Sequence, residues 1–377
     1  MIKNYLMTPG PTPVPPEVLL SMAKPIIHHR TPQFQKILQE VEENLKYLFQ
    51  TANNVLIFAS SGTGAMEGAV CNLLSPGDKA ITVQGGKFGE RWTEICKAYG
   101  VEAIAIDVEW GKAVDPKVIE KKLSTGAIKA VFTTLCETST GVATDIKAIA
   151  EVVKKTEAVL VVDAISALGA VECKTDEWGI DVVVSGSQKG LMIPPGLAFA
   201  AVSPKAWKVI EQNKSPKYYF DFKKSKKSIE KTDTPFTPAI SLIIGLNAAL
   251  KILRQEGLDS VVARHKQMAK AIREAAKALG LELLSPTAAS DAVTAIKVAQ
   301  GIDGGKLVKT MRDEYGVGIA GGQADFKGKI FRIASMGYMN QFDVIIAISC
   351  LEIVLSRMGY KFELGAGVKA TQKVFLD

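Results

Sequence analysis

Short apolar runs alternate with helix-length segments through the first two hundred residues of this 377-residue chain. A strand buried on both faces needs apolar residues at almost every position, and most of these runs are followed by a segment long enough for a crossover helix. The pattern therefore predicts an α/β fold in which a large domain holds a mainly parallel seven-stranded sheet covered by helices. The predicted strands are 54–60, 79–84, 101–108, 128–134, 158–164, 180–186 and 197–203.

One connection between these strands is too short for a helix. Only residues 187–196 separate the strand at 180–186 from the strand at 197–203. Parallel neighbours need a crossover of a dozen or more residues, so the last strand is predicted to be antiparallel.

The chain beyond residue 203 predicts a second, smaller α/β unit. The segment "PAISLIIGLNAALKILRQEG" reads as a long helix ending at Gly257, and a helix over 259–279 follows it. The later elements are strands near 291–298 and 329–334 and a helix at 342–358. Because a chain of this length exceeds one small core, we predict three parts. They are an N-terminal segment over the active site (1–20), a large domain (21–257) and a small C-terminal domain (258–377).

Composition narrows the class of protein further. Hydrophobic residues make up 47% and charged residues 23% of the chain, which is an ordinary globular mixture. No apolar stretch is long enough to span a membrane, and the start "MIKNYLMTPGPTPVPP" lacks the apolar core of a signal peptide. The five scattered cysteines form no CxxC pair. That pattern favours reduced thiols in a cytoplasmic protein over a disulfide framework or a zinc site.

The net charge of +7 is concentrated in one place. The segment 214–231, "KSPKYYFDFKKSKKSIEK", is rich in lysine and holds several aromatic residues. A nucleic-acid surface is one interpretation. A solvated connection that attracts anionic substrates is the interpretation we favour, because the rest of the chain carries no basic stripe.

Small residues follow the first strand, where an open parallel sheet binds its ligand. In "SSGTGAME", residues Ser61, Gly62 and Thr63 open a helix. Backbone N–H groups and hydroxyls at a helix N-terminus form a cradle for an anion. The string lacks the third glycine of a dinucleotide fingerprint. A phosphate group therefore suits it better than a pyrophosphate, although a capped helix start explains it equally well.

Two ionisable residues stand at the ends of neighbouring apolar strands. Asp163 follows "AVLVV" and either caps a turn or faces a buried cationic ring nitrogen, since an unpartnered buried carboxylate would be neutral. Lys189 follows "DVVVSGSQ" and precedes the stiff, apolar "GLMIPPG". It either extends along the strand end to solvent or stays in an apolar pocket as a free amine that condenses with a carbonyl.

The ordered set of phosphate loop, aspartate and lysine predicts one cofactor. Pyridoxal phosphate is a phosphate-bearing aldehyde on a pyridinium ring, so it needs a helix N-terminus, a carboxylate and an amine together. Each feature alone is weak evidence, but the set is specific.

The chain resembles the class V aminotransferases of fold type I, especially the alanine–glyoxylate, serine–glyoxylate and serine–pyruvate group. The resemblance covers nearly the whole chain. Its motifs here are "MTPGPTPVPPEVL", "SSGTGAMEGAV", "ETSTGV", "VVDAISALGA", "SGSQKGLMIPPG" and "GKIFRIASMG".

The resemblance implies a role for each residue that would surround the cofactor. Lys189 matches the catalytic lysine that forms a Schiff base, and Asp163 matches the partner of the pyridine nitrogen. Thr138 falls where a hydroxyl bonds the phenolic oxygen, and Phe88 falls where an aromatic ring stacks on the cofactor. Close relatives often carry tryptophan at this last position, so the indole N–H is missing here. The implied phosphate contacts are Ser61, Gly62, Thr63 and Gln188.

Other matches concern the substrate and a second subunit. Arg332 in "FRIASMG" matches the arginine that binds the substrate carboxylate, for which its planar fork suits bidentate contact. Pro9 and Gly10 lie in the "TPGP" turn, which resembles a segment over the substrate. Thr234 and Thr237 approximately match a segment that reaches the neighbouring subunit's phosphate site. The resemblance therefore implies a homodimer with shared active sites.

The predicted reaction is transamination between a small amino acid, alanine or serine, and a keto acid, glyoxylate or pyruvate. An aspartate donor stays open because Arg30 or Arg91 could bind a side-chain carboxylate. A lyase of the cysteine desulfurase or kynureninase kind is the rival enzyme, but the three histidines are not at the stacking position and Cys350 lies in an apolar run. A non-catalytic scaffold is disfavoured by the joint presence of the lysine, the aspartate and Arg332.

Overall fold

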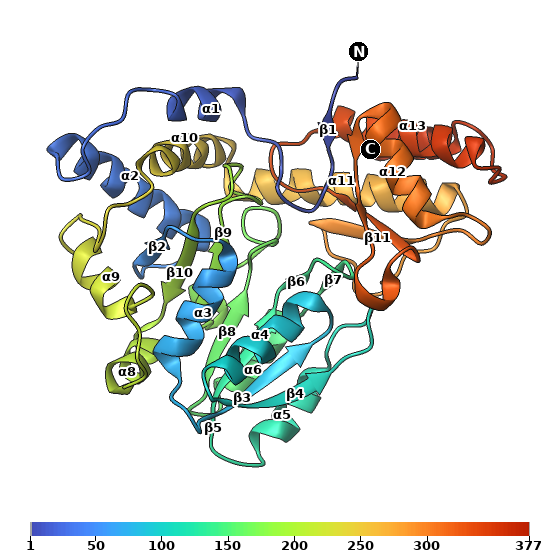
Figure 1. Ribbon diagram of the computed structural model, residues 1–377. Coiled ribbons are helices and arrows are strands. Elements are labelled where there is room, and N and C mark those ends of the chain that lie inside the picture. The colour runs from blue at the N-terminus through green and yellow to red at the C-terminus, as the bar shows by residue number, and fades with distance from the viewer. Residues whose placement is uncertain (1, 377) are drawn as a thin grey trace.

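A computed structural model describes residues 2–376 and contains the predicted sheet (Figure 1). Its strand order is β2-β10-β9-β8-β5-β3-β4. β10 is antiparallel to β9 and β2, whereas the other neighbours are parallel. The fold-class prediction and the antiparallel last strand are therefore confirmed. The strand bounds are β2 Val55–Phe58, β3 Lys79–Gln84, β4 Glu102–Asp107, β5 Ile128–Thr134, β8 Val159–Asp163, β9 Val182–Gly186 and β10 Ala198–Val202.

Both faces of the central strands β5, β8 and β9 are buried, as the continuous apolar runs require, whereas the edge strand β4 is largely exposed or half-buried. In β8, Val159 and Val161 point into one core while Leu160 and Val162 point into the other. The first core is covered by α3 (Gly62–Leu73), α4 (Lys87–Ala98) and α8 (Pro204–Gln212). The second is covered by α2 (Pro32–Phe49), α5 (Pro116–Leu123), α6 (Ile146–Val153) and α10 (Ile240–Glu256). Each such buried aliphatic side chain stabilises the fold by roughly 1.5–3 kcal/mol.

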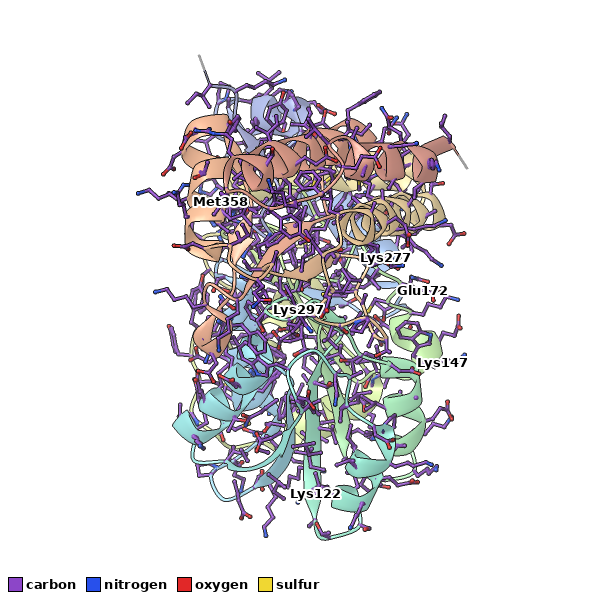
Figure 2. All side chains as sticks on the ribbon, turned by 90° about the vertical axis from the view of Figure 1, so that its right-hand side faces the viewer. Lys122, Lys147, Glu172, Lys277, Lys297 and Met358 are labelled. Carbon is purple, nitrogen blue, oxygen red and sulfur yellow. The ribbon has the colours of Figure 1, made fainter. Side chains whose placement is uncertain are left out.

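The C-terminal part forms a smaller unit, seen at the upper right of Figure 1. Figure 2 shows it from the side, with Met358 and Lys277 in this unit above Lys122 in the large one. Its sheet is antiparallel in the order β11-β14-β13, and Gly257 separates α10 from α11 with a positive φ of 83°. The elements are α11 Leu258–Ala278, β11 Val293–Lys297, α12 Gly304–Tyr315, β13 Ala320–Gly321, η1 Ala324–Phe326, β14 Ile330–Ala334, α13 Gln341–Arg357 and α14 Ala366–Leu376. The division of the chain into the three parts 1–20, 21–257 and 258–377 stays a prediction.

The N-terminal segment runs from the small unit to the large one. β1 (Tyr5–Leu6) pairs with β12 (Val317–Gly318), and the N–H of Ala334 donates to the carbonyl of Met7. Farther along, the N–H of Thr12 donates to the carbonyl of Gln188, so this segment crosses the carboxyl ends of the large sheet. The remaining elements are α1 Pro16–Met22, β6 Cys136–Glu137, β7 Val142–Ala143, α7 Thr175–Trp178 and α9 Phe222–Ile229.

Within residues 2–376, no helix is both long and apolar enough to cross a bilayer. The lysines of 214–231 lie around α9 and its preceding loop, where Lys224 and Lys226 stack over Tyr218 and Trp207. Within this segment Tyr218 therefore partners Lys224, whereas the partner of Lys226 is Trp207 in α8.

Candidate active site

Lys189 is buried at the carboxyl edge of the sheet, with 8% of its surface exposed. Its Nζ donates to the carbonyl of Pro9, and the hydroxyl of Thr12 donates to the carbonyl of Lys189 at 2.9 Å. A Cβ on Gly10 would lie 2.5 Å from Cδ and Cε of Lys189, so this glycine allows the close approach. Burial is the main cause that lowers the pKa of Lys189 to about 8. The interpretation of a lysine extending to solvent is therefore wrong.

Asp163 ends the neighbouring strand and is 3% exposed. The N–H of Ile165 donates to its Oδ1 at 2.8 Å. Burial raises the pKa of Asp163 to about 7, which the nearby Lys189 and Arg91 charges oppose. Among residues 2–376, no cation lies within ion-pair distance of this carboxylate. It is therefore poised for a cationic partner.

The start of α3 lies beside both residues. Ser61 is its N-cap residue, and its side chain makes no capping hydrogen bond. A Cβ on Gly62 would overlap Ile165, so the loops after β2 and β8 pack closely. The Gln188 Oε1 is buried and has no hydrogen-bond partner among the described residues. This oxygen and the Gly62 nitrogen lie on the same side of Gly186, because an added Cβ there would be 3.3 Å from the first and 3.5 Å from the second.

A cation also faces this helix start. The Arg91 Nη1 donates to the Thr63 hydroxyl at 3.3 Å, and its guanidinium lies 5.0 Å from the centre of the Phe88 ring. Helix N–H groups, a hydroxyl and a guanidinium together suit a phosphate dianion. Sequence reasoning considered Arg91 only as a substrate ligand. Arg91 comes three residues after Phe88, so the two side chains lie on the same face of a helix. This spacing is the sequence signal that could have assigned Arg91 to the same site.

Thr138 and Arg332 lie in contact. The Thr138 hydroxyl is 2.6 Å from that of Ser166. Arg332 is 5% exposed and donates through Nη1 to the Thr138 carbonyl at 2.8 Å, and through Nε and Nη2 to the Gly321 carbonyl. Within the described chain it contacts no carboxylate, and burial lowers its pKa. A buried guanidinium held by carbonyls alone is a natural receptor for an incoming carboxylate.

The segment with Thr234 and Thr237 lines a small cavity together with Phe58 and Ala59 at the end of β2, just before the loop 61–63 of the same protomer. The Thr234 hydroxyl donates to the carbonyl of Phe236, and Thr237 is exposed. Across residues 2–376, no hydrogen bond joins either threonine to the loop 61–63. A contact with a second subunit is therefore still a prediction for these two residues.

The residues proposed for other chemistries are already occupied or remote. Arg30 forms an ion pair with Asp233 at 2.5 Å. His28 and His29 stack on one another, and His265 is buried in α11. Cys350 is 5% exposed in α13, and burial raises its pKa to about 11.

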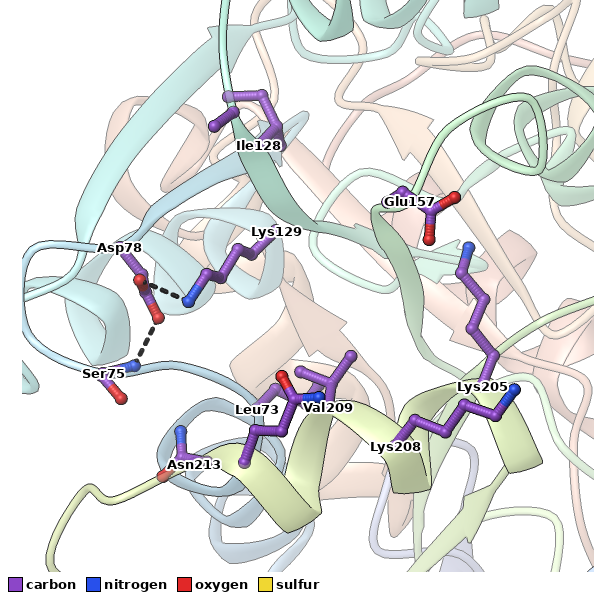
Figure 3. Close-up of a pocket in the computed structure, with 12 residues that line it drawn as sticks. Leu73, Ser75, Asp78, Ile128, Lys129, Glu157, Lys205, Lys208, Val209 and Asn213 are labelled. Carbon is purple, nitrogen blue, oxygen red and sulfur yellow. Dashed lines mark hydrogen bonds and ion pairs between the residues drawn. The ribbon is translucent and has the colours of Figure 1, made fainter.

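A separate surface cavity of about 500 Å³ lies at the opposite edge of the sheet (Figure 3). There Lys129 pairs with Asp78 at 2.7 Å, and Lys205 bonds the Ala158 carbonyl. Ile128 begins β5 here, whereas the end of β5 adjoins Asp163. The cavity is therefore distinct from the Lys189 site.

The fold is that of the fold type I pyridoxal-phosphate-dependent aminotransferases. The family model described as aminotransferase class-V matches residues 4–341. The chain belongs to this family.

Similar proteins include two named aminotransferases. The chain is 38% identical to the serine–glyoxylate aminotransferase of Hyphomicrobium methylovorum (99% of this chain, 95% of that protein) and 36% identical to the L-aspartate–glyoxylate aminotransferase of Paracoccus denitrificans (98% and 96%). It is also 45% identical to a protein of Anabaena cylindrica named soluble hydrogenase 42 kDa subunit, with 99% of each covered. Among solved structures, the ureidoglycine–glyoxylate aminotransferase of Bacillus subtilis superposes with a TM-score of 0.96 at 30% identity, covering 100% and 99% of the two chains. An aminotransferase function is thereby supported.

Proposed function

We propose that this protein transfers an amino group from a small amino acid, serine or alanine, to glyoxylate or pyruvate, with pyridoxal phosphate bound at Lys189. The observation that carries the proposal is the buried amine of Lys189 near the buried carboxylate of Asp163, whose charge acts on its pKa. Neither has an ion-pair partner in the described chain.

The residues present fit this cofactor. The uncapped start of α3 and Arg91 lie on one side, where the phosphate would bind. The amide N–H₂ group of Gln188 would donate to it, whereas its Oε1 can only accept a hydrogen bond. Asp163 would hold the proton of the pyridine nitrogen, and that cation would keep the carboxylate ionised. Phe88 would stack on the ring, and the Thr138 hydroxyl would bond its phenolic oxygen. When bound, the cofactor supplies an electron sink that stabilises negative charge at the substrate Cα.

The protein's own side chains then do three things. Lys189, with its lowered pKa, is a free amine in a substantial fraction of molecules near pH 8 and can take and return the Cα proton. Arg332 binds the substrate α-carboxylate and so orients the Cα–H bond. The N-terminal segment, whose Pro9 carbonyl contacts Lys189, covers the site and limits water.

Glyoxylate is the acceptor that we favour over pyruvate. It stands in the names of the serine-, aspartate- and ureidoglycine-dependent relatives. A small neutral donor is favoured because Arg30 is already paired with Asp233. Aspartate is the second candidate donor, supported by the aspartate–glyoxylate relative and by Arg91, whose charge reaches the site.

Two rival functions lack support from the geometry. A desulfurase needs a nucleophilic cysteine, yet Cys350 is buried in a helix with a raised pKa. A non-catalytic scaffold has no reason to hold a lysine, an aspartate and an arginine buried without ionic partners, because each costs desolvation free energy. We further propose a cytoplasmic homodimer in which Thr234 or Thr237 reaches the partner's phosphate site.

A donor-by-acceptor panel tests the proposal. Purified protein with added pyridoxal phosphate is incubated with serine, alanine or aspartate and with glyoxylate or pyruvate, and both products are measured. We expect glycine to form from glyoxylate at the expense of serine or alanine. Preferential use of aspartate would select the second candidate. Release of alanine and sulfide from cysteine without an acceptor would replace transamination with the lyase reaction.

A further inference from the structure

Glu137 is a buried carboxylate to which the proposed chemistry gives no role. It is 4% exposed and lies on β6, directly before Thr138. Its carboxylate accepts hydrogen bonds from the N–H groups of Phe88, Gly89 and Ser139 and from the Ser139 hydroxyl. Within the described chain it forms no ion pair, so backbone N–H groups compensate most of its charge.

These contacts cap α4 from another part of the chain. The first N–H groups of a helix have no partner within the helix, and α4 has no side-chain cap of its own. The Lys87 N–H donates to the Ser139 hydroxyl at 3.0 Å, while those of Phe88 and Gly89 donate to Glu137 at 3.2 and 2.9 Å. The positive end of the helix dipole also favours a carboxylate here.

The close approach is built into the sequence of the turn before α4. A Cβ on Gly86 would lie 2.6 Å from both Cγ and Cδ of Glu137. Only glycine at this position lets the Glu137 side chain pass beneath the turn and reach the helix start.

The segment Glu137–Ser139 also binds Arg332, the residue that we assign to the substrate carboxylate. Glu137 and Ser139 bind the first turn of α4, which carries Phe88. Between them, the Thr138 carbonyl accepts from Arg332. The ring-stacking face and the guanidinium are therefore fastened to adjacent residues of one short segment.

We propose that Glu137 is a positioning residue, which fixes Phe88 and Arg332 relative to one another so that cofactor ring and substrate carboxylate are held in register. This inference rests on the proposed function, because it assigns Phe88 to the ring and Arg332 to the substrate. Burial raises the pKa of Glu137, while its hydrogen bonds favour the ionised form.

The test compares Glu137→Gln with Glu94→Gln, an exposed position on the same helix. Glutamine keeps the length but loses the charge and turns an N–H₂ group toward backbone donors. Hydrogen bonds to a charged group stabilise more than those between neutral groups, so the substitution should loosen the start of α4. We therefore expect about tenfold weaker binding of pyridoxal phosphate, measured by fluorescence quenching. We also expect a weaker circular dichroism signal of the bound cofactor, a raised KM for the amino donor, and faster amide hydrogen exchange at residues 87–89 without cofactor. The control should match the wild type.

A lowered melting temperature with unchanged cofactor affinity, dichroism and KM would reduce Glu137 to a structural cap and overturn the inference. If Glu137→Gln does not fold, Ser139→Ala must show the same changes in smaller measure, and its failure to do so is equally decisive. Wild-type protein that binds no pyridoxal phosphate would overturn the proposed function instead. The exchange measurement on cofactor-free protein would still report whether Glu137 holds the start of α4.

Discussion

The pH at which Lys189 becomes reactive is a direct consequence of its burial. A solvent-exposed lysine has a pKa of 10.5, whereas the pKa of Lys189 is about 8. This difference corresponds to about 3 kcal/mol in favour of the neutral amine. At pH 8, about half of the Lys189 side chains are free amines, against roughly 0.3% for an exposed lysine. We therefore expect Lys189 to condense with an aldehyde about two orders of magnitude more readily than other lysines.

The assay is reductive trapping. Cofactor-free protein is pulsed briefly with pyridoxal phosphate and borohydride between pH 6 and 10.5, and labelling of each lysine is quantified by peptide mass spectrometry. Labelling of Lys189 should rise with a midpoint near pH 8. Asp163→Asn should move the midpoint to lower pH, because the Asp163 carboxylate raises the pKa of Lys189. The exposed Lys154 serves as the internal comparison. A Lys189 midpoint near 10 would refute the claim that burial activates the amine.

Four further outcomes follow from the same geometry. Asp163→Asn should lower transamination by about 100-fold or more in a single-turnover assay, because the ring nitrogen loses its anionic partner. Arg332→Lys should raise the KM for the amino donor by about tenfold or more with a smaller effect on cofactor affinity, since the planar fork is lost. Gly10→Ala should reduce cofactor loading, measured by absorbance, because its Cβ would overlap Lys189. The unfolding free energy of cofactor-free protein should rise between pH 8 and 10.5, by up to about 3 kcal/mol, because in this range Lys189 is protonated mainly in the unfolded state. Urea titrations measure this rise, and Lys189→Met should remove it.

The large sheet was predictable because local sequence determines it. Each of its strands is an apolar run bounded by polar residues, so the predicted and observed limits differ by only a few residues. The short connection 187–196 fixed the direction of the last strand by length alone. These features need no knowledge of distant contacts.

The small unit was less predictable. Its strands near 291–298 and 329–334 were found, but the antiparallel pairing of its sheet and the short strand at Ala320–Gly321 were not. The pairing of β1 with β12 joins residues more than three hundred positions apart, so no local pattern indicates it. Two-residue strands carry too few side chains to leave a periodicity.

The residues of the candidate site also differ in how far the sequence could predict them. Asp163 and Lys189 could be identified because a charge at the end of an apolar strand conflicts with its surroundings, and that conflict is visible in the sequence. Glu137 carries the same conflict after "AVFTTLC", yet its resolution is backbone N–H groups of a helix that begins some fifty residues earlier. Arg332 is similar, because its acceptors are carbonyls, which every residue possesses. When the compensating groups are backbone N–H and carbonyl groups, the sequence holds no partner residue that could be recognised, because nearly every residue carries both groups. The structure is therefore most informative about Glu137 and Arg332, where the compensating groups belong to the main chain.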